Sequence, residues 1–237
     1  MARKACVLRG PHQPRESIFI AVAAASFTLG TCATPVAAEG MAGTSVILAI
    51  GDSLTRGGFG SIPYTEFLSD MLGVEVENAG VWGELTEQML GRLEARLGAE
   101  STCEPPGDGP DCEPKSLQLR RPSVVLVLGG TNDLSRRTPL SETVANLQAM
   151  HELAASYGAV VGVLAVPLFL EPRIGWAKNR KALNDELVRL QATYEFPSFL
   201  VNLSQVPSTH LYDGLHFKSE GYWRFAELVA EQLRQFR

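Results

Sequence analysis

A serine, an asparagine and an aspartate–histidine pair stand in three short polar segments of this chain. Ser53 lies in the segment GDSL, Asn132 in GGTND, and Asp213 and His216 in DGLH. A serine hydroxyl is barely ionised at neutral pH, so it attacks a carbonyl carbon only when a neighbouring base removes its proton. An imidazole can accept that proton, and a carboxylate can hold the imidazole in place. These residue types therefore have the chemistry of a serine nucleophile and its base.

The histidine that acts as the base is predicted from its distance along the chain to an acid. Asp213 precedes His216 by three residues, so on a turn its carboxylate can reach one ring nitrogen while the other faces Ser53. His210 is an alternative base, because it lies three residues from Asp213 on the other side. His151 falls in the middle of a predicted helix and is interpreted as structural or exposed.

Negative charge that develops on an attacked carbonyl oxygen needs hydrogen-bond donors already in place. The predicted donors are the backbone N–H groups of Ser53 and Gly83 and the side-chain amide of Asn132. Gly83 ends the segment NAGVWG, where a missing side chain lets the backbone approach a substrate. Gly80 in the same segment is an alternative donor, and a plain turn is an alternative interpretation of Gly83.

Short apolar runs alternate with longer amphipathic stretches along the chain, which predicts strands and helices in alternation. Several runs are apolar on both faces, as strands buried between two helical layers are. The predicted strands span residues 45–50, 74–78, 123–128, 159–166 and 198–203, and the predicted helices span 63–72, 84–97, 140–158, 179–194 and 219–236. Five such units predict an α/β fold with three layers, in which a five-stranded parallel sheet lies between helices.

The polar segments have a common place in such a fold. GDSL, NAGVWG, GGTND and DGLH come after the first, second, third and fifth predicted strands. Ligands of open parallel sheets bind at the carboxyl ends of the strands. All four segments are therefore expected on one rim of the sheet, where Asp52 and Asp133 would brace the loops by accepting hydrogen bonds from backbone amides.

The same segments resemble the sequence blocks of the SGNH hydrolases, also called GDSL esterases and lipases. GDSL matches the first block of that family, NAGVWG the second, GTND the third and DGLH the fifth, and the resemblance extends over nearly all of residues 45–235. Within the family the chain is most similar to the secreted thioesterase, lysophospholipase and arylesterase branch. The resemblance implies a flavodoxin-like SGNH hydrolase fold and a serine esterase that needs no cofactor.

The resemblance also implies roles for individual residues. The family's histidine follows its acid, which favours His216 over His210 as the base. The implied catalytic triad is Ser53, Asp213 and His216, and the implied oxyanion hole is Ser53, Gly83 and Asn132.

The loop after the fourth predicted strand, VPLFLEPRIGW, is unusually apolar for a connection along the catalytic rim. It predicts walls for an acyl chain or an aromatic alcohol. The alternative is that its apolar side chains seal the loop onto the core. The predicted pocket residues are Trp82, Phe169, Leu170, Ile174 and Trp176.

Several activities fit these features. We expect hydrolysis of short- to medium-chain carboxylic esters or thioesters, with a small-molecule acyl ester as the partner. Removal of O-acetyl groups from carbohydrate, acyl transfer, and a non-catalytic binding module are the alternatives. The motifs GxxxxGK[ST], GxGxxG, GxSxG and HExxH do not occur, which disfavours nucleotide enzymes, the α/β-hydrolase nucleophile elbow and a zinc protease. No metal is expected. No feature of the sequence indicates an oligomeric state.

The first 38 residues have the layout of a secretory signal. Four basic residues precede the apolar run 18–30, and small residues lead to Ala38. We therefore expect a signal peptide at 1–38, a hydrolase domain at 39–237, and export to the periplasm or the outside. A membrane anchor is the alternative, but thirteen apolar residues are few for a bilayer span. A lipid anchor at Cys32 and an organellar transit peptide also remain open.

Cleavage after residue 38 would leave an acidic protein with two cysteines. It removes four basic residues and one acid, so the formal net charge moves from −5 to −8, which disfavours nucleic-acid binding. Cys103 and Cys112 flank a segment rich in proline and glycine, and two cysteines in an exported chain are expected to pair. Zinc is the alternative, but two cysteines without a nearby histidine make a poor site.

Overall fold

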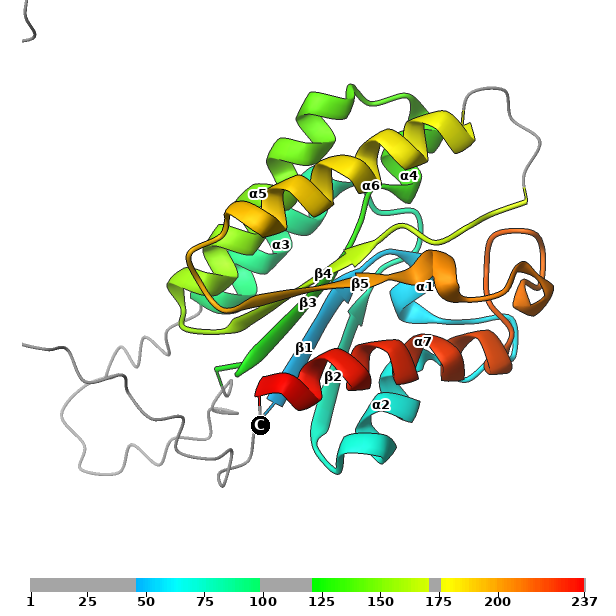
Figure 1. Ribbon diagram of the computed structural model, residues 1–237, viewed down its shortest axis with the longest axis horizontal. Helices are drawn as coiled ribbons and strands as arrows, with labels where there is room; N and C mark the ends of the chain where they lie inside the picture. The colour runs from blue at the N-terminus through cyan, green and yellow to red at the C-terminus, as the bar shows by residue number, and fades with distance from the viewer. Residues whose placement is uncertain (1–45, 99–120, 171–175, 237) are drawn as a thin grey trace, which may run out of the picture. The chain divides into compact units, whose positions relative to one another are not determined.

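Five parallel strands form the centre of the protein in the order β2-β1-β3-β4-β5 (Figure 1). The computed structural model describes residues 46–98, 121–170 and 176–236. The strands are β1 (Val46–Gly51), β2 (Glu75–Gly80), β3 (Val124–Leu128), β4 (Val160–Ala165) and β5 (Ser198–Asn202). The order 2-1-3-4-5 is that of flavodoxin-like folds. The expected five-stranded parallel sheet is confirmed.

The position of each strand explains its composition. Every residue of β1 and β3 is buried, and so is every residue of β4 after Val160. These three central strands are covered on both faces and therefore read as continuous apolar runs. The edge strands β2 and β5 are more exposed: only Gly80 of β2 is buried, and buried residues alternate with more exposed ones in β5.

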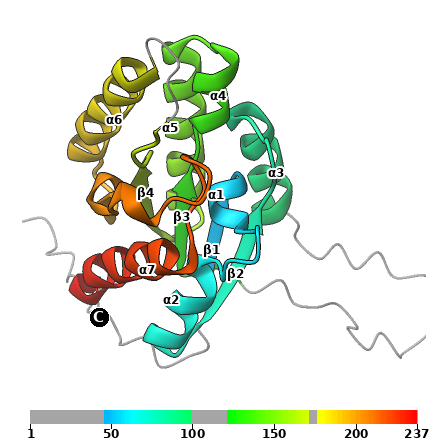
Figure 2. The ribbon, with the colours of Figure 1, turned by 90° about the vertical axis from the view of Figure 1, so that its right-hand side faces the viewer.

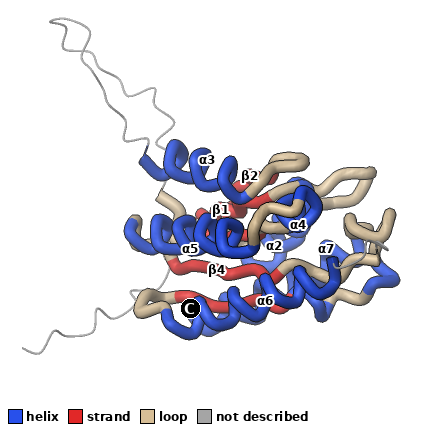
Figure 3. Tube along the Cα trace, turned by 90° about the horizontal axis from the view of Figure 1, so that it is seen from above, coloured by secondary structure: helices blue, strands red, loops and turns tan. Residues whose placement is uncertain are grey.

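Helices cover both faces of the sheet (Figures 1 and 3). Helices α2 (Tyr64–Leu72) and α7 (Ser219–Leu233) pack on one face. Helices α3 (Thr86–Gly98), α5 (Leu140–Ser156) and α6 (Trp176–Thr193) pack on the other. Met89, Leu93 and Leu97, which recur every four residues along α3, form an apolar stripe that lies in the core. The three predicted layers are therefore confirmed.

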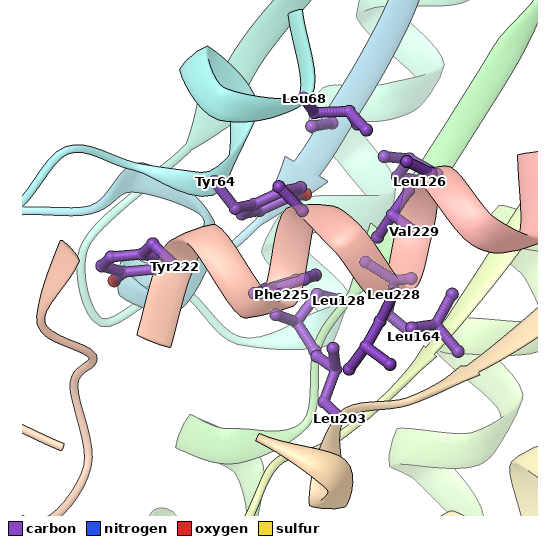
Figure 4. Close-up of a cluster of buried hydrophobic side chains, with 14 of the residues drawn as sticks. Tyr64, Leu68, Leu126, Leu128, Leu164, Leu203, Tyr222, Phe225, Leu228 and Val229 are labelled. Carbon is purple, nitrogen blue, oxygen red and sulfur yellow. The ribbon is translucent and has the colours of Figure 1, made fainter. Parts of the chain in front are cut away.

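Aromatic packing fixes α7 against α2 (Figure 4). The rings of Tyr64 and Phe225 are fully buried and stacked, with centroids 3.8 Å apart and planes 12° apart. The Phe217 ring, also buried, makes an edge contact with Tyr222 at the start of α7. Burial of large aromatic side chains contributes several kcal/mol. This packing anchors the segment immediately before α7, which carries Asp213 and His216.

The short elements at the rim differ most from the sequence prediction. Helices α1 (Ser53–Arg56) and α4 (Thr131–Arg136) begin in two of the polar segments, and 3₁₀ turns at Leu203–Gln205 and Ser208–His210 follow β5. Segments this short show no repeating helical pattern, so periodicity could not reveal them. Helix α6 also begins at Trp176, three residues before the predicted start at 179.

All described residues belong to one compact unit. The predicted signal peptide 1–38, Cys103, Cys112 and Ile174 lie outside the described residues. None of the helices in the described ranges is long and apolar enough to cross a membrane. Those same ranges contain no group of three or more histidine, cysteine, aspartate or glutamate side chains arranged to hold a metal ion.

Candidate active site

The candidate site lies where the strand order reverses. The chain leaves β1 toward β2 on one side, and β3 lies on the other side, which opens a crevice at the carboxyl ends of these strands. Figure 2 shows α1 at this edge, with the segment between β5 and α7 passing beside it. The sequence predicted that DGLH follows the fifth strand. In the structure, the two 3₁₀ turns lie between β5 and DGLH.

Ser53 is the first residue of α1, which begins two residues after β1 ends. The Asp52 carboxylate accepts a hydrogen bond from the Leu54 N–H at 2.8 Å and caps the helix. The backbone O of Asp52 accepts from Arg56 N–H at 3.0 Å, which closes the single turn. Ser53 is 7% exposed, so this capped turn holds a nearly buried serine.

Three side chains form a hydrogen-bonded chain across the site. The Ser53 Oγ lies 2.9 Å from His216 Nε2, and His216 Nδ1 lies 2.8 Å from Asp213 Oδ2. Asp213 Oδ1 also accepts from the backbone N–H groups of His216 and Leu215, at 2.8 and 3.0 Å. The carboxylate thereby holds both the imidazole ring and the loop that carries it.

The Asp213 carboxyl is kept ionised by its partners. Partial burial raises its pKa, but the hydrogen bonds from the His216 backbone, the His216 ring and the Leu215 backbone outweigh burial. The pKa of Asp213 therefore lies below its ordinary value. An ionised carboxylate at this position favours the imidazole tautomer with its proton on Nδ1, which leaves Nε2 free to accept a proton from Ser53.

His210 has a different place. Its backbone N–H donates to the Pro207 carbonyl at 3.0 Å, and its own carbonyl accepts from Lys218 N–H at 2.8 Å. These bonds close the base of the loop that carries His216. His216, rather than His210, is the histidine in contact with Ser53.

The loops that carry Gly83 and Asn132, two of the predicted oxyanion-hole donors, contact each other. Gly83 has a φ of 71°, a left-handed conformation that glycine adopts without strain. The Asn132 side-chain amide donates to the Glu84 carbonyl at 3.0 Å and to Asp52 Oδ2 at 3.4 Å. The N–H of Gly80, the alternative donor, already donates to Asn78 Oδ1 at 3.0 Å. The Gly80 N–H is thus already committed within its own loop.

Side chains behind these donors hold their loops together. Glu84, 8% exposed, forms a bidentate pair with Arg92 at 2.9 and 2.6 Å. Asp133 accepts from the Thr86 hydroxyl at 2.7 Å and from the Thr86 N–H at 3.1 Å. As expected from the sequence, Asp52 and Asp133 brace loops through backbone amides.

Asp52 is fully buried beside this network. Burial raises the pKa of its carboxyl from the ordinary 3.8 to about 7, against the hydrogen bond from Leu54 N–H that lowers it. The nearby carboxylates of Asp133 and Glu84 raise the pKa of Asp52 further. Asp52 and Asp213 therefore have their pKa values moved in opposite directions within one site.

Comparison with known proteins agrees with this geometry. The model of the GDSL-like Lipase/Acylhydrolase family matches residues 49–224, more than half of the chain, and the matched range includes the predicted triad and all three predicted oxyanion-hole donors. This chain belongs to the GDSL-like lipase/acylhydrolase family.

Individual relatives agree with the family. An arylesterase of Vibrio mimicus is 28% identical over 196 residues, which cover 79% of this chain and 87% of the arylesterase. The lipase/acylhydrolase from Enterococcus faecalis superposes with a TM-score of 0.62 at 22% identity, covering 81% of this chain and 96% of that one. The esterase EstA from a Pseudoalteromonas species superposes with a TM-score of 0.61 at 17% identity, covering 81% and 98%. These two structural likenesses show the shared fold.

As a GDSL-family member, the protein is a serine hydrolase that acts on ester bonds. The alternative of a non-catalytic binding module is thereby set aside.

The residues predicted to line the pocket have two different environments in the structure. Trp82 and Leu170 are 45% and 62% exposed at the rim, and Leu170 N–H donates to the Gly214 carbonyl beside His216 at 2.7 Å. Trp176 is 8% exposed, and the half-buried Phe169 makes an edge contact with it at 5.3 Å and packs on the core. Phe169 and Trp176 thus fit the alternative stated above, that apolar side chains of this loop pack onto the core.

Two aromatic residues of this GDSL site were not predicted from the sequence. Phe59 and Tyr212 are 53% and 59% exposed, and their rings stack with centroids 5.5 Å apart. Phe59 also lies 5.0 Å from the His216 ring and 5.2 Å from Trp82. Phe59 follows GDSL by five residues and Tyr212 directly precedes DGLH. Their closeness in sequence to these two segments was the signal that could have identified them.

The buried carboxyl of Asp52 predicts a pH-dependent effect on stability. Between pH 3.8 and about 7 the folded protein retains a proton on Asp52 that the unfolded chain has lost, so stability falls as the pH rises through that window. Asparagine cannot ionise and can still accept from Leu54 N–H. The free energy of unfolding of Asp52→Asn minus that of the wild type should be roughly 2 kcal/mol higher at pH 8 than at pH 5. Urea unfolding at the two pH values measures this difference.

The matched control is Asp70→Asn, which removes an exposed carboxylate from α2. Its stability relative to the wild type should change little between the two pH values. An Asp52→Asn difference that is the same at pH 5 and pH 8 would contradict the assignment of a raised pKa to Asp52.

Proposed function

We propose that the protein hydrolyses short- to medium-chain carboxylic esters or thioesters through an acyl-enzyme on Ser53. The observation that carries this proposal is the continuous hydrogen-bonded chain from Ser53 Oγ through the His216 ring to Asp213, with distances of 2.9 and 2.8 Å. Family membership supports the broader activity, ester hydrolysis.

The first half of the proposed reaction forms the acyl-enzyme. His216 Nε2 takes the hydroxyl proton while Ser53 Oγ bonds to the carbonyl carbon, whose oxygen becomes an oxyanion. Asp213 stabilises the imidazolium, as its lowered pKa allows. The imidazolium then gives its proton to the leaving oxygen or sulfur, the bond from that atom to carbon breaks, and the alcohol or thiol departs.

The second half releases the acid. His216 Nε2 takes a proton from a water molecule, and the water oxygen attacks the acyl carbon. The tetrahedral intermediate collapses, the Ser53 Oγ–carbon bond breaks, and the proton returns from Nε2 to Oγ. An alcohol entering in place of water would give acyl transfer by the same steps.

The oxyanion would be bound by the Ser53 and Gly83 N–H groups and the Asn132 amide. Ser53 supports this role because the N–H of a first helical residue has no partner within its helix. Asn132 supports it because one of its N–H contacts, to Asp52, is 3.4 Å long and therefore weak. That N–H can be shared with a substrate oxygen, while the 3.0 Å bond to the Glu84 carbonyl keeps the amide in place.

The rim favours apolar acyl esters over acetylated carbohydrate. Trp82 and Leu170 are exposed there, and we propose that they contact the substrate. A carbohydrate site would present more polar side chains to bind hydroxyl groups.

We also propose that the chain is exported, cleaved near Ala38 and cross-linked between Cys103 and Cys112. The support is the basic and apolar pattern of the first 38 residues together with the even number of cysteines that cleavage leaves.

Loss of the serine hydroxyl tests the nucleophile. We expect the wild type to hydrolyse p-nitrophenyl butyrate and Ser53→Ala to lose at least about 10,000-fold in kcat, because no other group can form the acyl-enzyme. His216→Ala should lose a comparable factor. The measurement is release of p-nitrophenol at saturating substrate.

His210→Ala is the control for that experiment, because it removes the other histidine near Asp213 and should stay within about twofold of the wild type. Full activity in Ser53→Ala would overturn the proposed function. A severe loss in His210→Ala with His216→Ala unaffected would overturn the choice of base.

Truncation of Asn132 tests the oxyanion hole. Asn132→Ala should lower kcat by about 100- to 1,000-fold with little change in KM, since the donor acts on charge that develops in the transition state. Steady-state kinetics with p-nitrophenyl butyrate provide both constants. A rise in KM with kcat unchanged would instead make Asn132 a substrate-binding residue.

Processing and cross-linking are tested on protein recovered from the outside of expressing cells. Intact mass should fit a chain that begins near residue 39. Alkylation of the denatured protein should modify no cysteine before reduction and both Cys103 and Cys112 afterwards. The disulfide should add about 2 to 3 kcal/mol of stability. An unprocessed chain or freely alkylated cysteines would contradict these proposals.

A further inference from the structure

Phe59 stands in a backbone conformation that is unusual for a bulky side chain. Its φ is 55°, within a turn formed by Gly57, Gly58 and Gly60. A positive φ at an aromatic residue is a genuine outlier, and such strain persists where surrounding structure enforces it, often at functional sites. The strained backbone at Phe59 therefore points to a role for its ring.

Three loops bring aromatic rings together around His216. Phe59 comes from the loop after β1, Trp82 from the loop after β2, and Tyr212 from the segment before α7. The Phe59 ring stacks on Tyr212 at 5.5 Å with planes 15° apart, and meets Trp82 edge to face at 5.2 Å. The His216 ring lies 5.0 Å from Phe59 and 5.5 Å from Trp82. We name Phe59, Trp82 and Tyr212 the aromatic rim.

The glycine at position 58 is part of this arrangement. A side chain there would collide with the Trp82 indole, which packs directly on the Gly58 backbone. The close approach of Trp82 leaves Phe59 to project toward Tyr212 and His216. The strained turn thus serves to place one ring beside the catalytic histidine.

The aromatic rim is open to solvent. Its three side chains are 53%, 45% and 59% exposed, although aromatic residues that only pack a core are buried. Among the described residues, nine large apolar side chains are exposed, and seven of them lie in the loops around this crevice: Phe59, Ile62, Val81, Trp82, Leu168, Leu170 and Tyr212. Such a concentration of exposed apolar surface marks a binding site.

The proposed mechanism says which part of the substrate meets the aromatic rim. His216 Nε2 must deliver its proton to the leaving oxygen, so the leaving group has to lie against the His216 ring. Phe59 and Trp82 are the rings next to it. The carbonyl oxygen would instead bind the donors proposed for the oxyanion, Ser53, Gly83 and Asn132.

We propose that Phe59, Trp82 and Tyr212 form a subsite for a flat aromatic leaving group, with Phe59 as the residue that determines specificity. This inference rests on the proposed function. An aromatic alcohol can make stacked or edge contacts with rings already arranged at 5 to 5.5 Å, whereas a small alkyl alcohol fills little of the surface.

The test compares benzyl acetate with ethyl acetate, which share an acyl group and have leaving alcohols of similar acidity. Phe59→Gly should lower the ratio of kcat/KM for benzyl over ethyl acetate by about 10-fold, because stacking surface is lost only for the benzyl ester. Its Tm should equal or exceed that of the wild type, since glycine adopts a φ of 55° without strain. Tyr212→Leu should lower the ratio by a smaller factor.

Trp223→Leu is the matched control, because Trp223 is 46% exposed on α7 and lies outside the aromatic rim. It should leave the ratio unchanged. If Phe59→Gly does not fold, Phe59→Asn provides the same comparison, as asparagine tolerates a positive φ. An unchanged ratio, or an equal fall for both esters, would overturn the subsite and leave the proposed function intact, whereas full activity in Ser53→Ala would overturn the proposed function itself.

Discussion

The site depends on one hydrogen bond, between Ser53 Oγ and His216 Nε2, which joins residues 163 positions apart. Each end is held by a different part of the fold. Ser53 sits on a single helical turn that Asp52 caps at the end of a fully buried strand. His216 sits on a loop fixed by Asp213 and by the burial of Phe217 against the start of α7. The core beneath α7 therefore sets the distance over which a proton would move.

Electrostatic environment distinguishes the carboxyl groups around this bond. Asp213 gains hydrogen bonds from His216 and Leu215 and stays ionised, so it can stabilise an imidazolium. Asp52 is fully buried, and the pKa of its carboxyl rises to about 7. Below about pH 7 the protonated Asp52 adds no negative charge beside Asn132, where the oxyanion would form. Glu84, also near Asp52, is neutralised by its bidentate pair with Arg92.

Much of this arrangement could be predicted from the sequence because it is encoded locally. The apolar runs of β1 and β3 reveal their double-sided burial, and the Asp-x-x-His spacing brings Asp213 to His216 within one loop. Phe59 and Tyr212 could not be predicted, since their contact joins two distant loops and depends on a positive φ that no periodic pattern reports. The buried state of Asp52 likewise depends on neighbours supplied by other loops.

The most direct test of the account is covalent labelling with a fluorophosphonate, followed by intact mass and peptide mapping. A phosphonyl group should add once, with loss of fluoride, on Ser53, because among the described residues that hydroxyl lies within hydrogen-bond distance of His216, which can remove its proton. Labelling should be lost in His216→Ala. A label on another residue, or undiminished labelling of His216→Ala, would contradict the central claim that His216 activates Ser53.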